Sequence, residues 1–198
     1  ISQLSFSQHL PHYMTEHEKK IMPIYLDQIT SRGETSPPSS EVRSAAEWEE
    51  MQGMLISWQS FSSVLTQMTA AAVEQGKVFI VTQSQSYVQN QLTNAGVSLD
   101  SVVFLNEPSN TVWIRDYGPN NVYTNNVDSL IFVDWIYNRP RPDDDVIPAA
   151  LAELLNIPLY ETTQSPYELV GTGGNFMSDG FGTGFSSELI IEENYPLT

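Results

Sequence analysis

The first half of the chain alternates short apolar runs with amphipathic stretches. Apolar runs predict three buried strands, at residues 54–58, 77–82 and 101–105. Between them, residues 64–75 and 84–96 have the pattern of short helices, with Ser84 as a candidate N-cap. Gly76 and Gly96 follow the last helical positions, where glycine tolerates a left-handed backbone. This order of strand, helix, strand, helix and strand predicts an α/β unit.

The second half of the chain carries shorter β-like runs that are separated by Gly, Pro and Asn turn signals. They occur at residues 111–115, 121–123, 129–135, 157–160, 168–170, 173–177 and 184–190. A predicted helix over residues 145–155 interrupts them. Clusters of short strands around a helix favour an α/β or α+β domain of repeated units over one uninterrupted βαβ series.

The N-terminal part, residues 1–45, is predicted to be an extension or linker. It is polar and broken by prolines, and the stretch GETSPPSS at 33–40 has the composition of a loop. A helix is expected only within residues 14–29, with an interruption near Pro23. All three histidines of the chain lie in this part, at His9, His12 and His17. Their spacing loosely resembles that of metal ligands, but no second ligand set accompanies them, so we expect no metal site.

Composition narrows the classes of partner. The formal net charge of -16 repels polyanions and concentrates cations, so nucleic acid is not expected and a cationic ligand is favoured. Solubility alone is an equally simple reason for this charge. No apolar run approaches the roughly 20 residues needed to cross a bilayer, so no membrane span is expected. The chain has no cysteine and therefore supplies neither a disulfide nor a thiol nucleophile.

Two of the few arginines stand close together in NRPRP, residues 138–142. In an extended segment, Arg139 and Arg141 point to the same side and could clamp one carboxylate. The neighbouring prolines lower the entropic cost of holding both side chains in place. Pairing of the arginines with the aspartates at 143–145 is an equally good interpretation. Those aspartates are interpreted as an N-cap of the following helix rather than as a calcium site.

Two glycine-rich stretches occur at residues 171–175 and 180–184. Neither has the spacing of a phosphate-binding loop. We interpret them as turn glycines that permit a positive φ or a close approach of two backbones.

The stretch TVWIRDYGPN, residues 111–120, places Asp116 just before a Gly-Pro break. In an unbroken strand, alternation would put Trp113 and Asp116 on opposite faces, whereas a bend near Gly118 would bring them to one site. Asp116 is therefore a candidate functional carboxylate. The structural alternative is that it pairs with Arg115 or caps the turn.

Four motifs in this order resemble the Porphyromonas-type peptidylarginine deiminase and agmatine deiminase family of guanidine-modifying enzymes. The motifs are WEEMQGMLISW, VWIRDYGP, YNRPRPDDD and GGNFMSDG, and the resemblance runs from about Ala46 to the end. It implies a pentein fold, an α/β propeller of repeated strand-helix units around a central channel, which is incomplete in this chain. Residues 46–198 would then be the amino-terminal part of the catalytic domain.

The resemblance also implies an activity, the hydrolysis of an arginine guanidinium to citrulline and ammonia by a cysteine thiolate, without a cofactor. It gives Asp116 the catalytic task of holding the guanidinium through paired charge-assisted hydrogen bonds. Trp113 would pack on the bound cation. Thr172 and Asn175, in the stretch GTGGN, are expected to bind substrate.

The resemblance also implies a substrate class, through one match with the peptidylarginine deiminases and one departure from the agmatine deiminases. Arg139 and Arg141 match the pair that, in bacterial peptidylarginine deiminases, grips the carboxylate of a carboxy-terminal arginine. Agmatine deiminases carry a Glu where Thr172 stands here. Both features favour an arginine-bearing small molecule or peptide as the partner, with agmatine as the alternative.

The family's later His-x-Asp element and its nucleophilic cysteine have no counterpart in this sequence. The chain alone therefore cannot perform the covalent reaction, and we expect an amino-terminal fragment or processed half whose partner carries these groups. An incomplete propeller should expose a sheet edge and apolar surface. The alternative is a non-catalytic module for arginine-like ligands or for assembly. Secretion or a periplasmic location is favoured, with the cytoplasm as the alternative.

Overall fold

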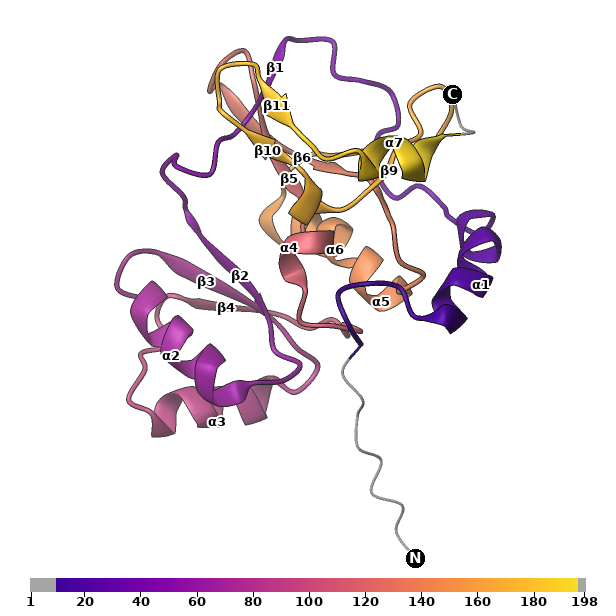
Figure 1. Cartoon of the computed structure of the whole chain (residues 1–198). Helices are drawn as coiled ribbons and strands as arrows, with labels where there is room; N and C mark the ends of the chain where they lie inside the picture. The colour runs from indigo at the N-terminus through magenta and orange to yellow at the C-terminus, as the bar shows by residue number, and fades with distance from the viewer. Residues whose placement is uncertain (1–9, 196–198) are drawn as a thin grey trace, which may run out of the picture.

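The computed structural model describes residues 10–195. A parallel sheet with two helices forms one end of the molecule (Figure 1). The strands pair in the order β2 (Gly53–Ser57), β3 (Lys77–Val81) and β4 (Val102–Leu105). The connecting helices are α2 (Ser62–Ala72) and α3 (Gln85–Asn94). This unit confirms the predicted order of strands and helices in the first half of the chain.

Both faces of β3 are buried, which is typical of a parallel sheet covered on two sides. Val78 and Ile80 pack in the apolar cluster that includes α3, whereas Phe79 and Val81 belong to the cluster that includes α6 (Ile147–Leu155). Gly96 has φ +76, and its N–H and that of Val97 bond to carbonyls of the last helical turn of α3. The predicted glycine stop of this helix is therefore confirmed.

A second, mixed sheet lies above the first unit in Figure 1. Its order is β1 (Val42–Ser44), β5 (Asn120–Thr124), β6 (Ser129–Asp134) and β8 (Leu159–Glu161). The first three strands are antiparallel, and β6 pairs in parallel with β8. The chain crosses from β6 to β8 through α5 (Pro142–Asp145) and α6. The helix predicted over 145–155 is confirmed as α6, and the short helix α5 that precedes it was not predicted.

Smaller elements complete the described chain. They are α1 (Glu16–Leu26), α4 (Ile114–Tyr117), β7 (Ile136–Tyr137), β9 (Val170–Gly171), the 3-10 turn η1 (Gly173–Asn175), β10 (Met177–Ser178), β11 (Gly184–Phe185) and α7 (Leu189–Asn194). β7 pairs in parallel with β9, and β10 and β11 form a hairpin. α7 is attached to β9 because Asn194 both accepts from and donates to the main chain of Val170.

Four sequence-based expectations are corrected. Residues 111–115 do not form a strand, because the chain turns into α4 there. Residues 184–190 begin as β11 but end in α7, and α1 continues through Pro23 without interruption. The predicted linker also contributes β1, which pairs with β5.

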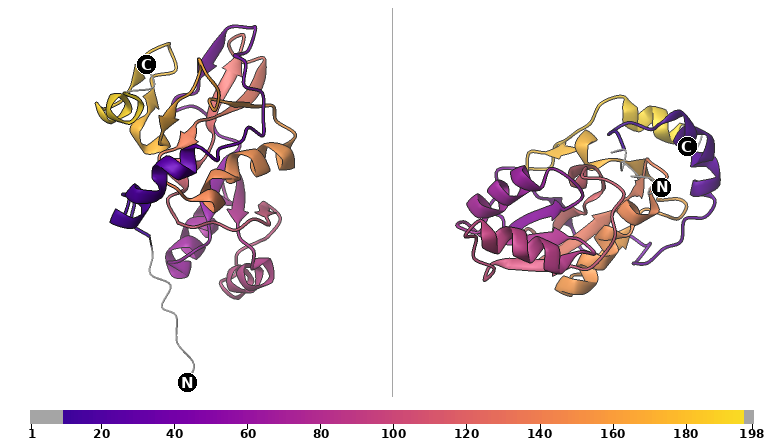
Figure 2. Two further views of the ribbon diagram at one scale, coloured as in Figure 1. Left: turned by 90° about the vertical axis from the view of Figure 1, so that its right-hand side faces the viewer. Right: turned by 90° about the horizontal axis from the view of Figure 1, so that it is seen from below.

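The architecture is mixed α/β, as predicted. Between residues 10 and 195 the strands form separate sheets that do not close into a ring, and the propeller stays a prediction. In the views of Figures 1 and 2, α1 lies on the opposite side of the molecule from α2 and α3. In the described part of the chain, no helix is both long and apolar enough to cross a membrane.

Candidate functional site

Where a strand was expected at residues 111–115, a network of hydrogen bonds holds Asn110 and Thr111 instead. The carboxylate of Asp144 is fully buried and accepts bonds from the main-chain nitrogens of Asn110 (2.7 Å) and Thr111 (3.0 Å) and from the Thr111 hydroxyl (2.8 Å). Burial raises the pKa of Asp144 to about 6, although these bonds act in the opposite direction. The three aspartates lie within α5, and Asp143 and Asp144 bind the loop that precedes α4. Their interpretation as an N-cap of the next helix is wrong, because that N-cap is Val146.

The single turn of α4 brings Trp113 and Asp116 together. Trp113 is the N-cap of this turn, and its carbonyl accepts the N–H of Asp116 at 2.8 Å. Residues three apart on a helical turn lie on the same side, so the bend occurs before Gly118 and not at it. Arg115 donates to Glu47 and to the carbonyls of Gly173 and Phe176, and not to Asp116. The proposed pairing of Asp116 with Arg115 is therefore wrong.

The paired glycines of GTGGN allow η1 to approach α4 closely. A Cβ at Gly173 would lie 2.2 Å from the Arg115 carbonyl oxygen, and one at Gly174 would lie 2.6 Å from Oδ1 of Asp116. The Thr172 hydroxyl donates to the main-chain oxygen of Asp116 at 3.3 Å. The close backbone approach predicted for this stretch is confirmed. In the second stretch Gly180 and Gly182 have positive φ, which was the other backbone role predicted for these glycines.

Asp116 combines partial burial with nearby positive charge. Burial raises the pKa of its carboxyl above the ordinary value, while Arg139, a hydrogen bond with Thr172, and the charges of His12 and Arg141 act in the opposite direction. A cation with hydrogen-bond donors that binds beside such a carboxylate stabilises its charged form. The exposed ring of Trp113 lies one turn away and offers a face for the same cation.

Arg139 and Arg141 point to the same side, as their spacing predicts, and both contact the N-terminal segment. Nε and Nη2 of Arg139 donate to the carbonyl of His12 at 2.9 and 2.7 Å. Arg141 is almost fully buried, and its carboxylate partner is Glu18, with 2.7 Å between Nε and Oε1. The alternative pairing with the aspartates at 143–145 is therefore wrong for Arg141.

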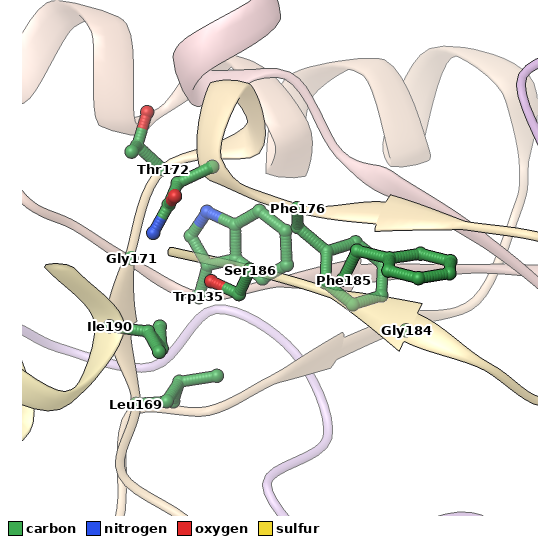
Figure 3. Close-up of a pocket in the computed structure, with 10 residues that line it drawn as sticks. Trp135, Leu169, Gly171, Thr172, Phe176, Gly184, Phe185, Ser186 and Ile190 are labelled. Atoms are coloured by element: carbon green, nitrogen blue, oxygen red, sulfur yellow. The ribbon is translucent and has the colours of Figure 1, made fainter. Parts of the chain in front are cut away.

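Thr172 and Asn175 line a cavity of about 320 Å³ next to this site (Figure 3). The other lining side chains are mainly apolar, from Trp135, Leu169, Phe176, Phe185 and Ile190. The amide oxygen of Asn175 accepts bonds from the main chain (3.1 Å) and the hydroxyl (2.7 Å) of Ser187. Thr172 therefore lines the cavity and also bonds to Asp116, whereas the side-chain oxygen of Asn175 bonds to Ser187.

His12 and Glu18 were not predicted to belong to this site. The ring of His12 lies edge-on to Trp113 with 5.7 Å between centroids, and Glu18 pairs with Arg141. Only the spacing of Thr15 and Glu18, which form a capping box at the start of α1, was a usable sequence signal. His9 lies outside the described residues. Within residues 10–195, no group of three or more His, Cys, Asp or Glu is arranged to hold a metal ion.

Solved structures share this fold. C. jejuni agmatine deiminase has a TM-score of 0.64 and 21% identity, over 80% of this chain and 50% of that one. A putative agmatine deiminase has a TM-score of 0.67 and 18% identity, over 82% of this chain and 50% of that one. A putative arginine deiminase from Porphyromonas gingivalis has a TM-score of 0.61 and 14% identity, over 75% of this chain and 47% of that one. This chain thus spans about half the length of these proteins.

The sequence itself matches a family profile over most of its length. The profile describes Porphyromonas-type peptidyl-arginine deiminase and covers residues 43–194, which include α4, the arginine pair and η1. The chain belongs to the Porphyromonas-type peptidyl-arginine deiminase family.

Proposed function

We propose that this chain supplies the guanidinium-holding part of a deiminase that converts arginine to citrulline and ammonia. The observation that carries the proposal is that Asp116 and the exposed ring of Trp113, both at α4, lie near Arg139, which follows β7. A guanidinium is a planar fork of N–H donors, so a carboxylate binds it in two places and orients its central carbon for attack. The indole ring adds cation–π attraction on the face of the cation.

The ligand in this proposal is free arginine or an arginine at the carboxyl end of a peptide. Arg139 and Arg141 support a carboxylate-bearing ligand, because Arg141 already binds a carboxylate in the fork geometry. Agmatine is the second candidate. The observation in its favour is that the chain's own N-terminal segment already binds the arginine pair. Agmatine has no carboxylate, so its binding does not need these arginines.

The covalent step needs groups from outside this sequence. A thiolate must attack the guanidinium carbon and a histidine must move protons, and the chain has no cysteine. In this proposal residues 46–198 form the first part of a pentein propeller, and a second part supplies the His-x-Asp element and the cysteine. The cavity beside Thr172 and the exposed apolar side chains of β10, β11 and α7 support a surface that the second part covers.

Calorimetric titration of the purified chain with arginine tests the proposal. The wild-type chain should bind arginine, and Asp116→Asn should weaken binding at least about tenfold, because loss of a charge-assisted pair costs about 1.5–3 kcal/mol. Asp128→Asn, at an exposed turn of the same chain, is the matched control and should bind as the wild type does. Equal affinity of the Asp116 and Asp128 variants would show that Asp116 does not hold the guanidinium.

A further inference from the structure

The N-terminal segment Leu10–Glu18 runs directly over the arginine pair and Trp113. The indole N–H of Trp113 donates to the carbonyl of Leu10 at 3.0 Å, and Arg139 donates twice to the carbonyl of His12. Nη2 of Arg141 donates to the carbonyls of Pro11 (2.7 Å) and Tyr13 (3.2 Å). Donors of the two guanidinium groups are thus bound by main-chain oxygens from three successive residues of one segment.

The segment ends in a carboxylate that binds Arg141. Oε1 of Glu18 lies 2.7 Å from Nε of Arg141, and Oε2 lies 3.4 Å from Nη2, with side-chain exposures of 7% and 1%. A capping box orients Glu18, since Oε2 accepts the N–H of Thr15 at 2.7 Å and the Thr15 hydroxyl accepts the N–H of Glu18 at 3.2 Å. Although burial alone raises the pKa of Glu18, the hydrogen bonds from Arg141 and Thr15 lower it overall. The carboxylate is therefore held in its charged form.

One set of donors cannot serve two carboxylates at once. In each arginine the fork of Nε and Nη2 is already engaged, by Glu18 and the segment carbonyls for Arg141 and by the carbonyl of His12 for Arg139. The third nitrogen, Nη1, is buried without a partner among the described residues in Arg141, and in Arg139 it donates to the carbonyl of Asn138. A ligand carboxylate that binds the Nε and Nη2 fork of either arginine must therefore replace Glu18 or the segment carbonyls. A guanidinium that binds at Asp116 and carries no carboxylate makes no such demand on the pair.

We propose that Glu18 is a specificity-determining residue, which occupies the carboxylate-binding arginine pair and so disfavours ligands with a free carboxylate. In this proposal, which rests on the proposed function, such ligands bind only as the segment Leu10–Glu18 is displaced. Agmatine binds with the segment in place. The N-terminal segment thus determines which ligands bind. With the segment in place the site favours agmatine, and its removal or displacement allows ligands with a free carboxylate to bind.

Hydrogen exchange of the wild-type chain tests the displacement directly. Peptides from residues 10–26 should exchange faster when glycyl-arginine saturates the site, because the segment loses its bonds to the arginines. Agmatine at saturation should leave their exchange unchanged. Slow exchange with both ligands, or faster exchange with both, would overturn the proposal. This experiment needs no variant and therefore does not depend on the folding of one.

Titration of two variants on the same helix turn measures the competition. Glu18→Gln keeps the shape of the side chain and removes its charge, and it should bind glycyl-arginine about tenfold more tightly than the wild type, with agmatine affinity unchanged. Glu16→Gln is the matched control, because Glu16 is 83% exposed and pairs only with Lys19 among the described residues. It should bind both ligands as the wild type does.

The outcomes separate this inference from the proposed function. Equal affinity of all three proteins for glycyl-arginine would overturn the role of Glu18 and leave guanidinium binding at Asp116 intact. Failure of all three proteins to bind either ligand would overturn the proposed function and the inference with it. Circular dichroism of each variant confirms that the compared proteins are folded.

Discussion

At the residue scale, the protonation of Asp116 should control how tightly the guanidinium binds. Burial raises the pKa of this carboxyl above its ordinary value, and only the charged form pairs with a cation. Arginine affinity should therefore fall as the pH falls through that raised pKa, and binding near it should release a proton. Calorimetry between about pH 4 and pH 7 in buffers of different ionisation enthalpy measures both effects. A wild-type profile as flat as that of Asp116→Asn would contradict this assignment.

Two neighbouring glycines offer a second test at this scale. Gly174→Ala places a Cβ against the Asp116 carboxylate, whose side chain can move, so arginine binding should weaken while the melting temperature stays near that of the wild type. Gly173→Ala places a Cβ against a main-chain oxygen, and overpacking there should cost about 1–3 kcal/mol of unfolding free energy. Thermal denaturation and arginine titration of both variants check the contrast. Unchanged arginine affinity in Gly174→Ala would show that its Cβ does not disturb the carboxylate.

At the element scale, α5 should stabilise the loop before α4 through Asp144. Asp144→Ala removes the acceptor for Asn110 and Thr111, and each buried group left unpaired costs about 1–3 kcal/mol. Asp144→Asn retains an acceptor oxygen and should be less destabilising. Urea unfolding at neutral pH compares the two variants. Equal losses would mean that packing, and not hydrogen bonding, holds the loop.

The same carboxyl predicts a pH dependence of stability. Its pKa in the folded chain, about 6, lies above the unfolded value of about 3.9, so the folded state binds more protons between these values. The contribution of Asp144 to the unfolding free energy should therefore fall as the pH rises from about 4 to about 6. Asp144→Asn cannot titrate and should lack this part of the slope in urea unfolding across that range. An identical slope in the wild type and the variant would contradict the assignment.

Elements defined by local signals were predictable, and those defined by distant partners were not. β2, β3 and β4 follow from apolar runs, and the end of α3 follows from Gly96, because these features need only neighbouring residues. Residues 111–115 have a strand-like pattern. In place of a sheet ladder, the N–H of Thr111 donates to Asp144 and its carbonyl accepts from the Ser57 hydroxyl.

The same distinction holds in the candidate site. Asp116 and the arginine pair carry recognisable residue types in short motifs, so they could be proposed from the sequence. The pairing of Glu18 with Arg141 spans 123 residues, and no periodicity or motif in the chain encodes such a distance. The segment over the arginines could therefore be found only from the folded chain.

At the scale of the whole molecule, the last described elements carry exposed apolar side chains. Met177 lies in β10, Phe185 in β11 and Ile191 in α7, and Tyr195 directly follows α7. β11 and α7 also line the cavity beside Thr172, through Phe185 and Ile190. Large exposed apolar patches are uncommon on soluble monomers and mark surfaces that another body covers. This chain also spans only about half of the solved structures that share its fold.

The isolated chain should therefore self-associate through this surface. Sedimentation velocity should show concentration-dependent association for the wild type, whereas Phe185→Ser with Ile191→Ser should shift the chain towards the monomer, because two exposed apolar contacts are lost. Val64→Ser, at an exposed apolar position of α2, is the control and should associate as the wild type does. A wild-type chain that stays monomeric at all concentrations would show that this surface does not drive self-association. If the wild type does associate, addition of a polypeptide that carries the cysteine and the His-x-Asp element should suppress the self-association and produce arginine hydrolysis. The double variant should gain less hydrolytic activity than the wild type, because the surface that self-associates is also the surface that binds this polypeptide.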